Sequence, residues 1–104
     1  MGFRLFSMAR VAEDVKVELK KIKSCDEFLS KVLEIYRTQV LVDDRWGAPA
    51  FTLVLATGEP SVDLVISGRL GKIDVWWGGQ HYEEYVEMDV LEELYDYLNE
   101  RLPK

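Results

Sequence analysis

The chain has 104 residues, of which 48% are hydrophobic, 12% aromatic and 31% charged. This length fits one domain, and the composition excludes a disordered tail, a collagen-like repeat and a coiled-coil rod. The net charge of −6 argues against a general nucleic-acid binder, because neutralising phosphates needs an excess of Lys and Arg.

The single cysteine, Cys25, allows no internal disulfide and no cysteine-based zinc site. No run of about 18 apolar residues is present to cross a bilayer, and no apolar core of a secretory signal opens the chain. We therefore expect a cytoplasmic protein without membrane contact. Residues 1–11 are expected to be a flexible segment or a cover for the sheet, and residues 12–104 a single domain.

Residues 12–23 fit two patterns of secondary structure. Val15, Val17 and Leu19 alternate as in a strand. The spacing from Val11 through Val15 to Leu19 is also that of one helix face. A strand that leads into a capped helix is simpler than two helices in line, so we expect a strand here.

The next element is expected to be a helix over residues 25–37. Ser24 and Glu27 have the spacing of a capping box, in which each residue's side chain satisfies the other's backbone N–H. The apolar face of this helix would consist of Phe28, Leu29, Val32, Leu33 and Tyr36.

From residue 39 the apolar period changes to two, which predicts strands. The strands are expected over residues 39–46, 51–57, 62–67 and 72–77, with residues 81–88 as an edge strand or a loop. The segments between them hold only three or four residues. Turns this short join antiparallel strands, so the strands should form a meander.

The C-terminal helix is expected to begin at Asp89, whose side chain can cap it, with Glu92 at the third helical position. Its apolar stripe consists of Leu91, Leu94, Tyr95, Leu98 and Leu102. Pro103 would end it. The expected order is β-α-β-β-β-β-(β)-α, which predicts an α+β two-layer sandwich: an antiparallel meander of four to five strands with two helices on one face.

Alternation assigns each strand residue to one of two sheet faces. The face that the helices should cover is wholly apolar and comprises Phe51, Leu53, Leu55, Val62, Leu64, Ile66, Ile73, Val75 and Trp77. The second face has an apolar centre made of Val54, Val65 and Trp76. Its polar rim consists of Thr52, Asp63, Ser67, Lys72 and Asp74.

An apolar centre with a polar rim is the anatomy of an interface. Three occupants are considered for this second face: a second copy of the chain, the apolar residues 3–11, and a ligand or foreign partner. Symmetric dimers are the commonest oligomers, so we expect a homodimer that acts as a protein-interaction module without catalysis. The binding residues would be Val54, Asp63, Val65, Lys72, Asp74 and Trp76.

The alternative function is a small-ligand-binding or minor enzymatic domain that uses Asp63, Lys72, Asp74 and Trp76. Asp63 and Asp74 lie on neighbouring strands of one face, where paired carboxylates can support acid–base chemistry if they line a cleft. Lys72 is expected to neutralise them instead.

Other candidate sites have simpler structural explanations. His81 with Glu83 and Glu84 has the donors of a metal site, but adjacent residues diverge along a strand. Cys25 at a helix start could act as a nucleophile with His81 as its base, yet no orienting third group is evident. Asp43–Asp44 offers oxygen ligands for Mg²⁺, and aspartates are equally ordinary at a turn. No metal and no cofactor is expected.

Charge is unevenly spread along the chain. Residues 1–24 carry six basic side chains against three acidic ones, a net charge of +3. A second alternative is therefore nucleic-acid binding through Arg4, Arg10, Lys16, Lys20, Lys21 and Lys23. Residues 82–104 carry eight acidic side chains against two basic ones, a net charge of −6, so a basic protein is a candidate partner for the C-terminal helix.

Overall fold

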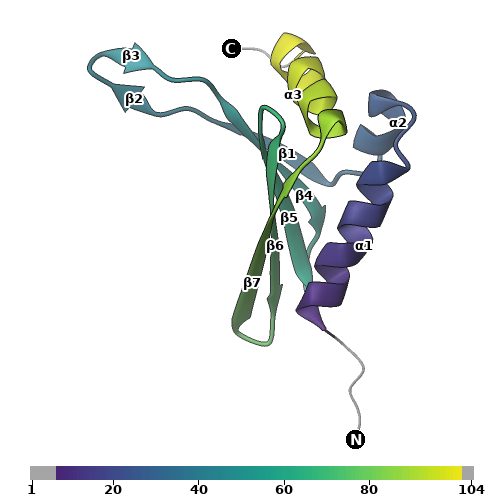
Figure 1. The fold of residues 1–104 in the computed structure, drawn as a ribbon. Coiled ribbons are helices and arrows are strands. Elements are labelled where there is room, and N and C mark those ends of the chain that lie inside the picture. Colours follow the sequence, from purple (N-terminus) through teal and green to yellow (C-terminus); the bar gives the residue numbers. More distant parts are fainter. Residues whose placement is uncertain (1–6, 102–104) are drawn as a thin grey trace, which may run out of the picture.

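The computed structural model describes residues 7–101, which form three helices and seven strands (Figure 1). In chain order these are α1 (Met8–Lys20), α2 (Cys25–Leu29), β1 (Glu34–Thr38), β2 (Leu41–Val42), β3 (Arg45–Trp46), β4 (Ala50–Ala56), β5 (Ser61–Ser67), β6 (Leu70–Trp77), β7 (Gln80–Glu87) and α3 (Asp89–Arg101).

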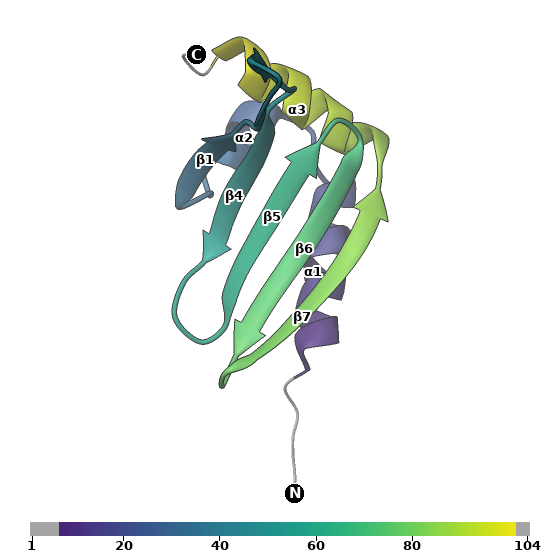
Figure 2. The same cartoon turned by 90° about the vertical axis from the view of Figure 1, so that its left-hand side faces the viewer.

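Five of the strands form one antiparallel sheet in the order β1-β4-β5-β6-β7 (Figure 2). All three helices lie on one side of this sheet, which we call the helical side (Figure 1). The opposite side, here called the open face, carries no helix of the described chain. The expected α+β two-layer arrangement with an antiparallel meander is thus confirmed, with three helices in place of two.

The core lies between the sheet and the helices. Alternation along the strands buries the side chains expected to face the helices, with two exceptions at strand ends. A register shift between Val54 and Ala56 leaves Leu55 only half-buried, and Trp77 is partly exposed where β6 ends. The fully buried side chains are Ala12, Leu19, Phe51, Leu53, Leu64, Ile66, Ile73, Val75, Leu91 and Leu94.

The strand expected over residues 12–23 is wrong: residues 12–20 belong to α1, and residues 21–23 connect it to α2. The segment follows the helical pattern and not the alternating one, because a helix buries both Ala12 and Leu19 in the core. Val17 is exposed on the outer side of this helix. Met8–Val11 form the first turn of the same helix, on the helical side. Residues 1–6, which include the rest of the expected N-terminal cover, lie outside the described residues.

The helix expected over residues 25–37 ends at Leu29, so the prediction of helix for residues 30–37 is also wrong. Its start is as expected, because the N–H of Glu27 donates to Ser24 Oγ at 3.3 Å. The chain then leaves the helix and pairs with β4, beginning with a hydrogen bond from the N–H of Leu33 to the carbonyl of Val54 at 2.8 Å. A capping box marks where a helix begins and carries no information on its length.

The strand expected over residues 39–46 is in fact a hairpin, which we call the arm (residues 39–48). Strands β2 and β3 pair only with each other. The chain reverses at Asp43 and Asp44, with φ values of 50° and 62°. A type I′ hairpin turn needs positive φ at both central residues, and Asp tolerates this better than most residues. Between residues 12 and 46, the expected elements are therefore wrong except for the start of α2 at Cys25.

The C-terminal half follows the expected order. Segment 81–88 is a true strand, because β7 pairs with β6 along its whole length. Helix α3 begins at Asp89 and buries Leu91, Leu94 and Leu98. Leu102 and Pro103, expected in the last turn and at its end, lie outside the described residues.

Helix α3 also holds the base of the arm. The hydroxyl of Tyr95 donates to the carbonyl of Pro49 at 2.7 Å, and the Tyr95 ring meets the buried Phe51 ring edge to face at 5.4 Å between centroids. The point at which the chain leaves the arm and enters β4 is thus fixed to the core.

Gly71 allows α3 to pack closely over the sheet. A Cβ at this position would lie 2.9 Å from Leu91 Cδ1 and 3.2 Å from Val86 Cγ2. We expect Gly71→Ala to lower the free energy of unfolding by about 1–3 kcal/mol through overpacking, measured by urea titration. Gly47→Ala is the control, since its Cβ would meet only Val40 O at 3.5 Å. An equal effect at both positions would contradict this packing.

Candidate functional site

The open face carries all six residues expected to bind. Cross-strand pairing sets Asp63 beside Asp74 and Val65 beside Lys72, and Trp76 lies opposite Ser61. The hairpin between β6 and β7 adds Glu83 opposite Asp74 and His81 opposite Trp76. Val54 lies on this face too, but its neighbours bury it, so it adds little to the accessible surface.

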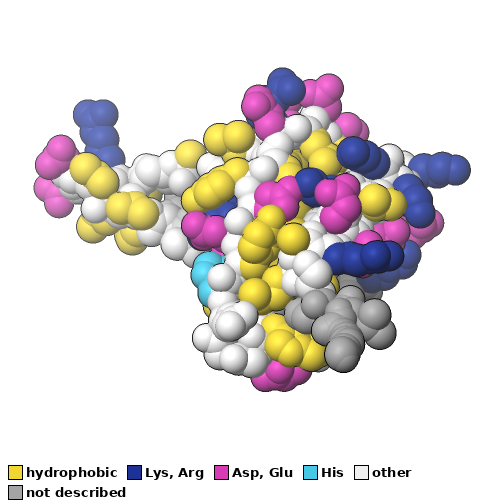
Figure 3. Space-filling model, turned by 60° about the horizontal axis from the view of Figure 1, so that its bottom comes forward, with side chains coloured by type: hydrophobic (Ala, Val, Ile, Leu, Met, Phe, Trp, Pro, Cys, Tyr) yellow, Lys and Arg dark blue, Asp and Glu magenta, His cyan; other side chains and the backbone are white. Residues whose placement is uncertain are grey.

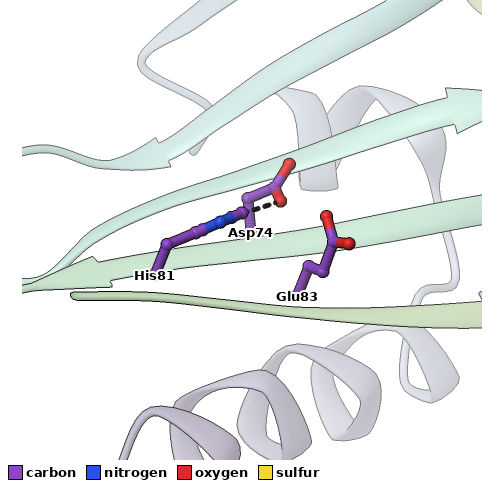
Figure 4. Close-up of side chains that lie close together, drawn as sticks. All are labelled: Asp74, His81 and Glu83. Carbon is purple, nitrogen blue, oxygen red and sulfur yellow. Dashed lines mark hydrogen bonds and ion pairs between the residues drawn. The ribbon is translucent and has the colours of Figure 1, made fainter.

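The centre of the open face is a cluster of charged side chains around Asp74 (Figure 4). Asp74 is 5% exposed, although it lies on the side of the sheet without helices. An N–H at His81 Nε2 donates to Asp74 Oδ1 at 2.8 Å, and Lys72 Nζ lies 3.6 Å from Asp74 Oδ2. Lys72 also lies 3.9 Å from Glu83 Oε2. A buried carboxylate needs such partners, because removing it from water is costly.

Trp76 covers this cluster at one end. Its indole stacks on the His81 ring with 4.9 Å between centroids and 13° between planes. The stack restricts the orientation of the imidazole that holds Asp74. Trp76 itself keeps a partly exposed face and therefore offers aromatic surface to a partner.

Asp63 lies between Val54 and Asp74 in register. Burial raises its pKa from the ordinary value of 3.8, and the nearby charge of Asp74 adds to the shift. The expected closeness of the two aspartates is thus observed. Lys72 approaches Asp74 and Glu83, so it neutralises only one member of the aspartate pair.

Asp74, His81 and Glu83 bring ligand atoms within 4.8 Å of one another, which is the spacing of a possible metal site. The Lys72 ammonium already lies beside two of these groups and supplies the positive charge there. A divalent cation would have to displace it. Sequence reasoning grouped His81 with Glu83 and Glu84, whereas the convergent partner is Asp74 on the neighbouring strand.

Glu84 points to the opposite side of the sheet, where it fastens α1 to β7. It is hydrogen-bonded to Lys16 Nζ and accepts a hydrogen bond from the Tyr82 hydroxyl at 2.8 Å. The hydrogen bonds from Lys16 and Tyr82 lower the pKa of Glu84, and the carboxylates of Glu84 and Glu13 raise that of Lys16 to about 12. Glu84 therefore has a structural role.

Sequence reasoning missed three apolar residues of the open face. Tyr36, Leu70 and Tyr85 extend it on both sides of the central strands and are well exposed. Tyr36 was assigned to a helix, and Leu70 to a turn. Tyr85 could have been found from the two-residue turn at Gly78–Gly79, which sets the register of β7.

Cys25 does not form a nucleophilic pair with His81. Cys25 packs against the core on the helical side, whereas His81 lies on the open face. Burial is also the main cause that raises the pKa of the Cys25 thiol. A raised pKa reduces the fraction of thiolate, which is the reactive form.

Two hollows lie away from the Asp74 cluster. One, of about 460 Å³, runs between α1, α2 and strands β4–β5 over an apolar floor that includes Val15, Phe28 and Val62. The other, of about 550 Å³, lies at the base of the arm beside Trp46 and Pro49. The ligand-binding alternative needs a pocket at Asp63, Lys72, Asp74 and Trp76, and none of these residues lines either hollow.

The basic residues of the N-terminal part are partly neutralised within the fold. Lys16 pairs with Glu13 at 3.0 Å, and Lys21 lies 4.0 Å from Glu18. Arg4 lies outside the described residues. Nucleic-acid binding by this segment, and docking of a basic partner on α3, stay predictions.

Opposite pH dependence is expected for two carboxyl groups. The raised pKa of Asp63 means that its contribution to stability is present below pH 3.8 and is lost as the pH rises through the raised value. Asp63→Asn should therefore be more stable than the natural protein near neutral pH, with the difference disappearing in acid. Thermal unfolding followed by circular dichroism across this range measures it.

Glu84→Gln is the matched control for the pH experiment. Because the pKa of Glu84 is lowered from 4.5, its stabilisation is present above that value and is lost as the pH falls. This variant should be less stable than the natural protein near neutral pH. A loss of stability in Asp63→Asn at neutral pH would contradict the assigned cause.

A zinc titration tests the role of Lys72. We expect the natural protein to bind Zn²⁺ weakly, and Lys72→Met to bind it at least about tenfold tighter, since removal of one ammonium leaves carboxylates unpaired. Isothermal titration calorimetry measures the two affinities. Adding His81→Ala should abolish the gain, and equal affinities with and without Lys72 would contradict this role.

The chain matches no protein-family model, no curated protein and no solved structure. No helix within residues 7–101 is long and apolar enough to cross a membrane. The residues themselves are therefore the basis for assigning a function. Two features require an explanation: an open face with a buried charged centre and exposed aromatic side chains, and an arm that projects beside it.

Proposed function

We propose that this chain is a small, acidic protein-interaction module without catalytic activity, which forms a homodimer through the open face of its sheet. The module acts in the cytoplasm, where a free thiol such as that of Cys25 stays reduced. The open face would be the contact surface in the dimer, and the helical side would remain in solvent.

The exposure of large apolar side chains on the open face is the observation that carries this proposal. Tyr85 is 68% exposed, Leu70 53%, Tyr36 51% and Trp76 38%. Alternation and register place all four on the same side of the sheet. Aromatic side chains are enriched at interfaces, and several large exposed apolar side chains around a charged centre are typical of a contact surface.

The charged centre favours an interface over an active site. Asp74 is already satisfied by His81 and Lys72, so the carboxylate at the centre is engaged within the fold. A second copy packed over this cluster would remove it from water together with its counter-charges. Such paired groups make a contact selective, because a mismatched partner would leave them unsatisfied.

The ligand-binding alternative rests on the same cluster. The His81 ring is hydrogen-bonded to Asp74 through Nε2, and its side chain is partly exposed. A small anion or a carbonyl compound would be the class of ligand for the Lys72 and His81 donors. The dimer is preferred because both hollows described above lie elsewhere on the molecule.

A charge placed at Val65 tests the dimer. Val65 lies at the centre of the open face, beside Lys72. We expect Val65→Glu to fold normally, because the new carboxylate faces that lysine, and to weaken the dimer at least about 30-fold. Sedimentation equilibrium measures the association constant.

Val17→Glu is the matched control, since Val17 is exposed on α1, on the helical side. It should dimerise as the natural protein does. Equal association by both variants would place the contact elsewhere on the molecule. A natural protein that stays monomeric at all concentrations reached would contradict the proposed function.

A further inference from the structure

The arm extends away from the body on the side of the open face. Figures 1 and 2 show it leaving the sheet at the end where α3 lies, and pointing away from all three helices. Its two strands have two residues each and pair only with each other. Because an isolated two-stranded hairpin is marginally stable in water, an arm of this length needs a further contact.

The arm is apolar on both of its sides. Val40 is 63% exposed, Leu41 52%, Val42 59% and Trp46 65%. Leu41 is paired with Trp46, and Val42 with Arg45, so neighbouring pairs point to opposite sides of the hairpin. Figure 3 shows hydrophobic side chains along the projecting arm and acidic ones at its tip.

We propose that each arm lies across the open face of a second copy of this chain, so that two arms and two faces form one symmetric dimer. This inference rests on the proposed function and names the segment that reaches across. The chain's own arm points away from its own face (Figure 1), whereas a two-fold axis brings the arm of each copy over the face of the other.

The area of such a contact reaches that of a specific interface. The side of each arm that carries Leu41 and Trp46 presents on the order of 250 Å² of apolar surface, at the exposures above and with roughly 150–250 Å² for each side chain. Two arms on two faces bury that area twice and cover an equal area of sheet. The total of about 1,000 Å² is the lower limit for a specific interface.

The charges of the open face favour a basic residue on its partner. The open face carries five carboxylates, from Glu34, Asp63, Asp74, Glu83 and Glu87, against Lys72 and Arg69, whose Nε lies 3.1 Å from Glu87 Oε2. Arg45 is the one basic residue between positions 38 and 68 and lies on the arm. Asp43 and Asp44 at the tip of the arm are negatively charged, as the open face is. They would have to stay in solvent at the edge of that face, which limits how far across it the arm can reach.

The base of the arm is held in one direction before any contact forms. Gln39 Nε2 donates to the carbonyl of Gly47 at 2.9 Å, and the N–H of Gly47 donates to the carbonyl of Val40 at 2.9 Å. The Tyr95 hydroxyl holds Pro49 at the start of β4. These contacts fix the base of the arm, so binding has to order only the part of the hairpin beyond it.

A second copy is a better occupant than an unrelated molecule because one contact then covers both unpartnered features. A foreign partner that fits the open face would leave the arm exposed, and one that fits the arm would leave the face exposed. An isologous contact covers the arm and the face of both copies, and it closes without forming a filament.

Substitutions in the arm distinguish this inference from the proposed function. Trp46→Glu changes only a side chain that is 65% exposed, so the fold should be retained. We expect it to weaken the dimer at least about 30-fold, as Val65→Glu does. If Val65→Glu dissociates the dimer and Trp46→Glu does not, the faces meet without the arm, and the inference fails while the proposed function stands.

A mixture of the two variants gives the sharper result. In a dimer of either variant alone, both arm-on-face contacts contain a substituted residue. In a mixed dimer, the natural arm of the Val65→Glu chain lies on the natural face of the Trp46→Glu chain, so one contact is intact. Native mass spectrometry, which separates the pair by mass, should therefore show the mixed dimer at least about tenfold more populated than either variant's own dimer. A mixed dimer no more abundant than the two self-dimers would overturn the arm-on-face arrangement.

Discussion

The central constraint on this molecule is that a five-stranded sheet has two faces and that its three helices pack on only one of them. The helical side is closed by Leu91, Leu94 and Leu98 of α3 and by the inner side of α1. The open face has to be stabilised by its own side chains or by another molecule. Its buried aspartate, the exposed aromatic residues around it and the projecting arm all follow from this asymmetry.

The charged cluster shows how a sheet face without helices can bury a carboxylate. Asp74 is shielded by the side chains around it, and it is paired with His81 and Lys72 rather than with backbone groups. Such a cluster is costly to remove from water when it lacks a partner, and it is selective when complete. A face that combines this cluster with Trp76 and two tyrosines has the composition of a specific contact surface.

The sequence predicts the middle of the sheet well and the N-terminal part poorly, for a physical reason. Apolar and polar residues alternate over long segments of β4, β5 and β6, and glycine-containing turns separate these strands. The period of two and the turns therefore both indicate strands at the same positions. Val15 and Leu19 lie on one face of a helix, four positions apart, and the exposed Val17 between them completes an alternation by coincidence. The strand Glu34–Thr38 begins only five residues after the end of α2, so the sequence pattern assigned it to the same helix.

The candidate site was partly predictable from the same turns. The pairing of Asp63 with Asp74 follows from alternation on two neighbouring strands. The contact between His81 and Asp74 requires the register of the following hairpin, which Gly78 and Gly79 set through their positive φ values. The arm was not predictable from apolar period alone, since Asp43 and Asp44 interrupt what otherwise resembles one continuous strand.

The mass of the natural, untagged protein in solution tests the account most directly, because the open face and the arm are both explained by a second copy. Native mass spectrometry at gentle activation should show a species at twice the chain mass of 12.1 kDa, with the monomer appearing only on dilution. A monomer that persists at high concentration would contradict the account. A monomer that carries extra mass of a few hundred daltons would also contradict it and would show that the protein binds a small molecule.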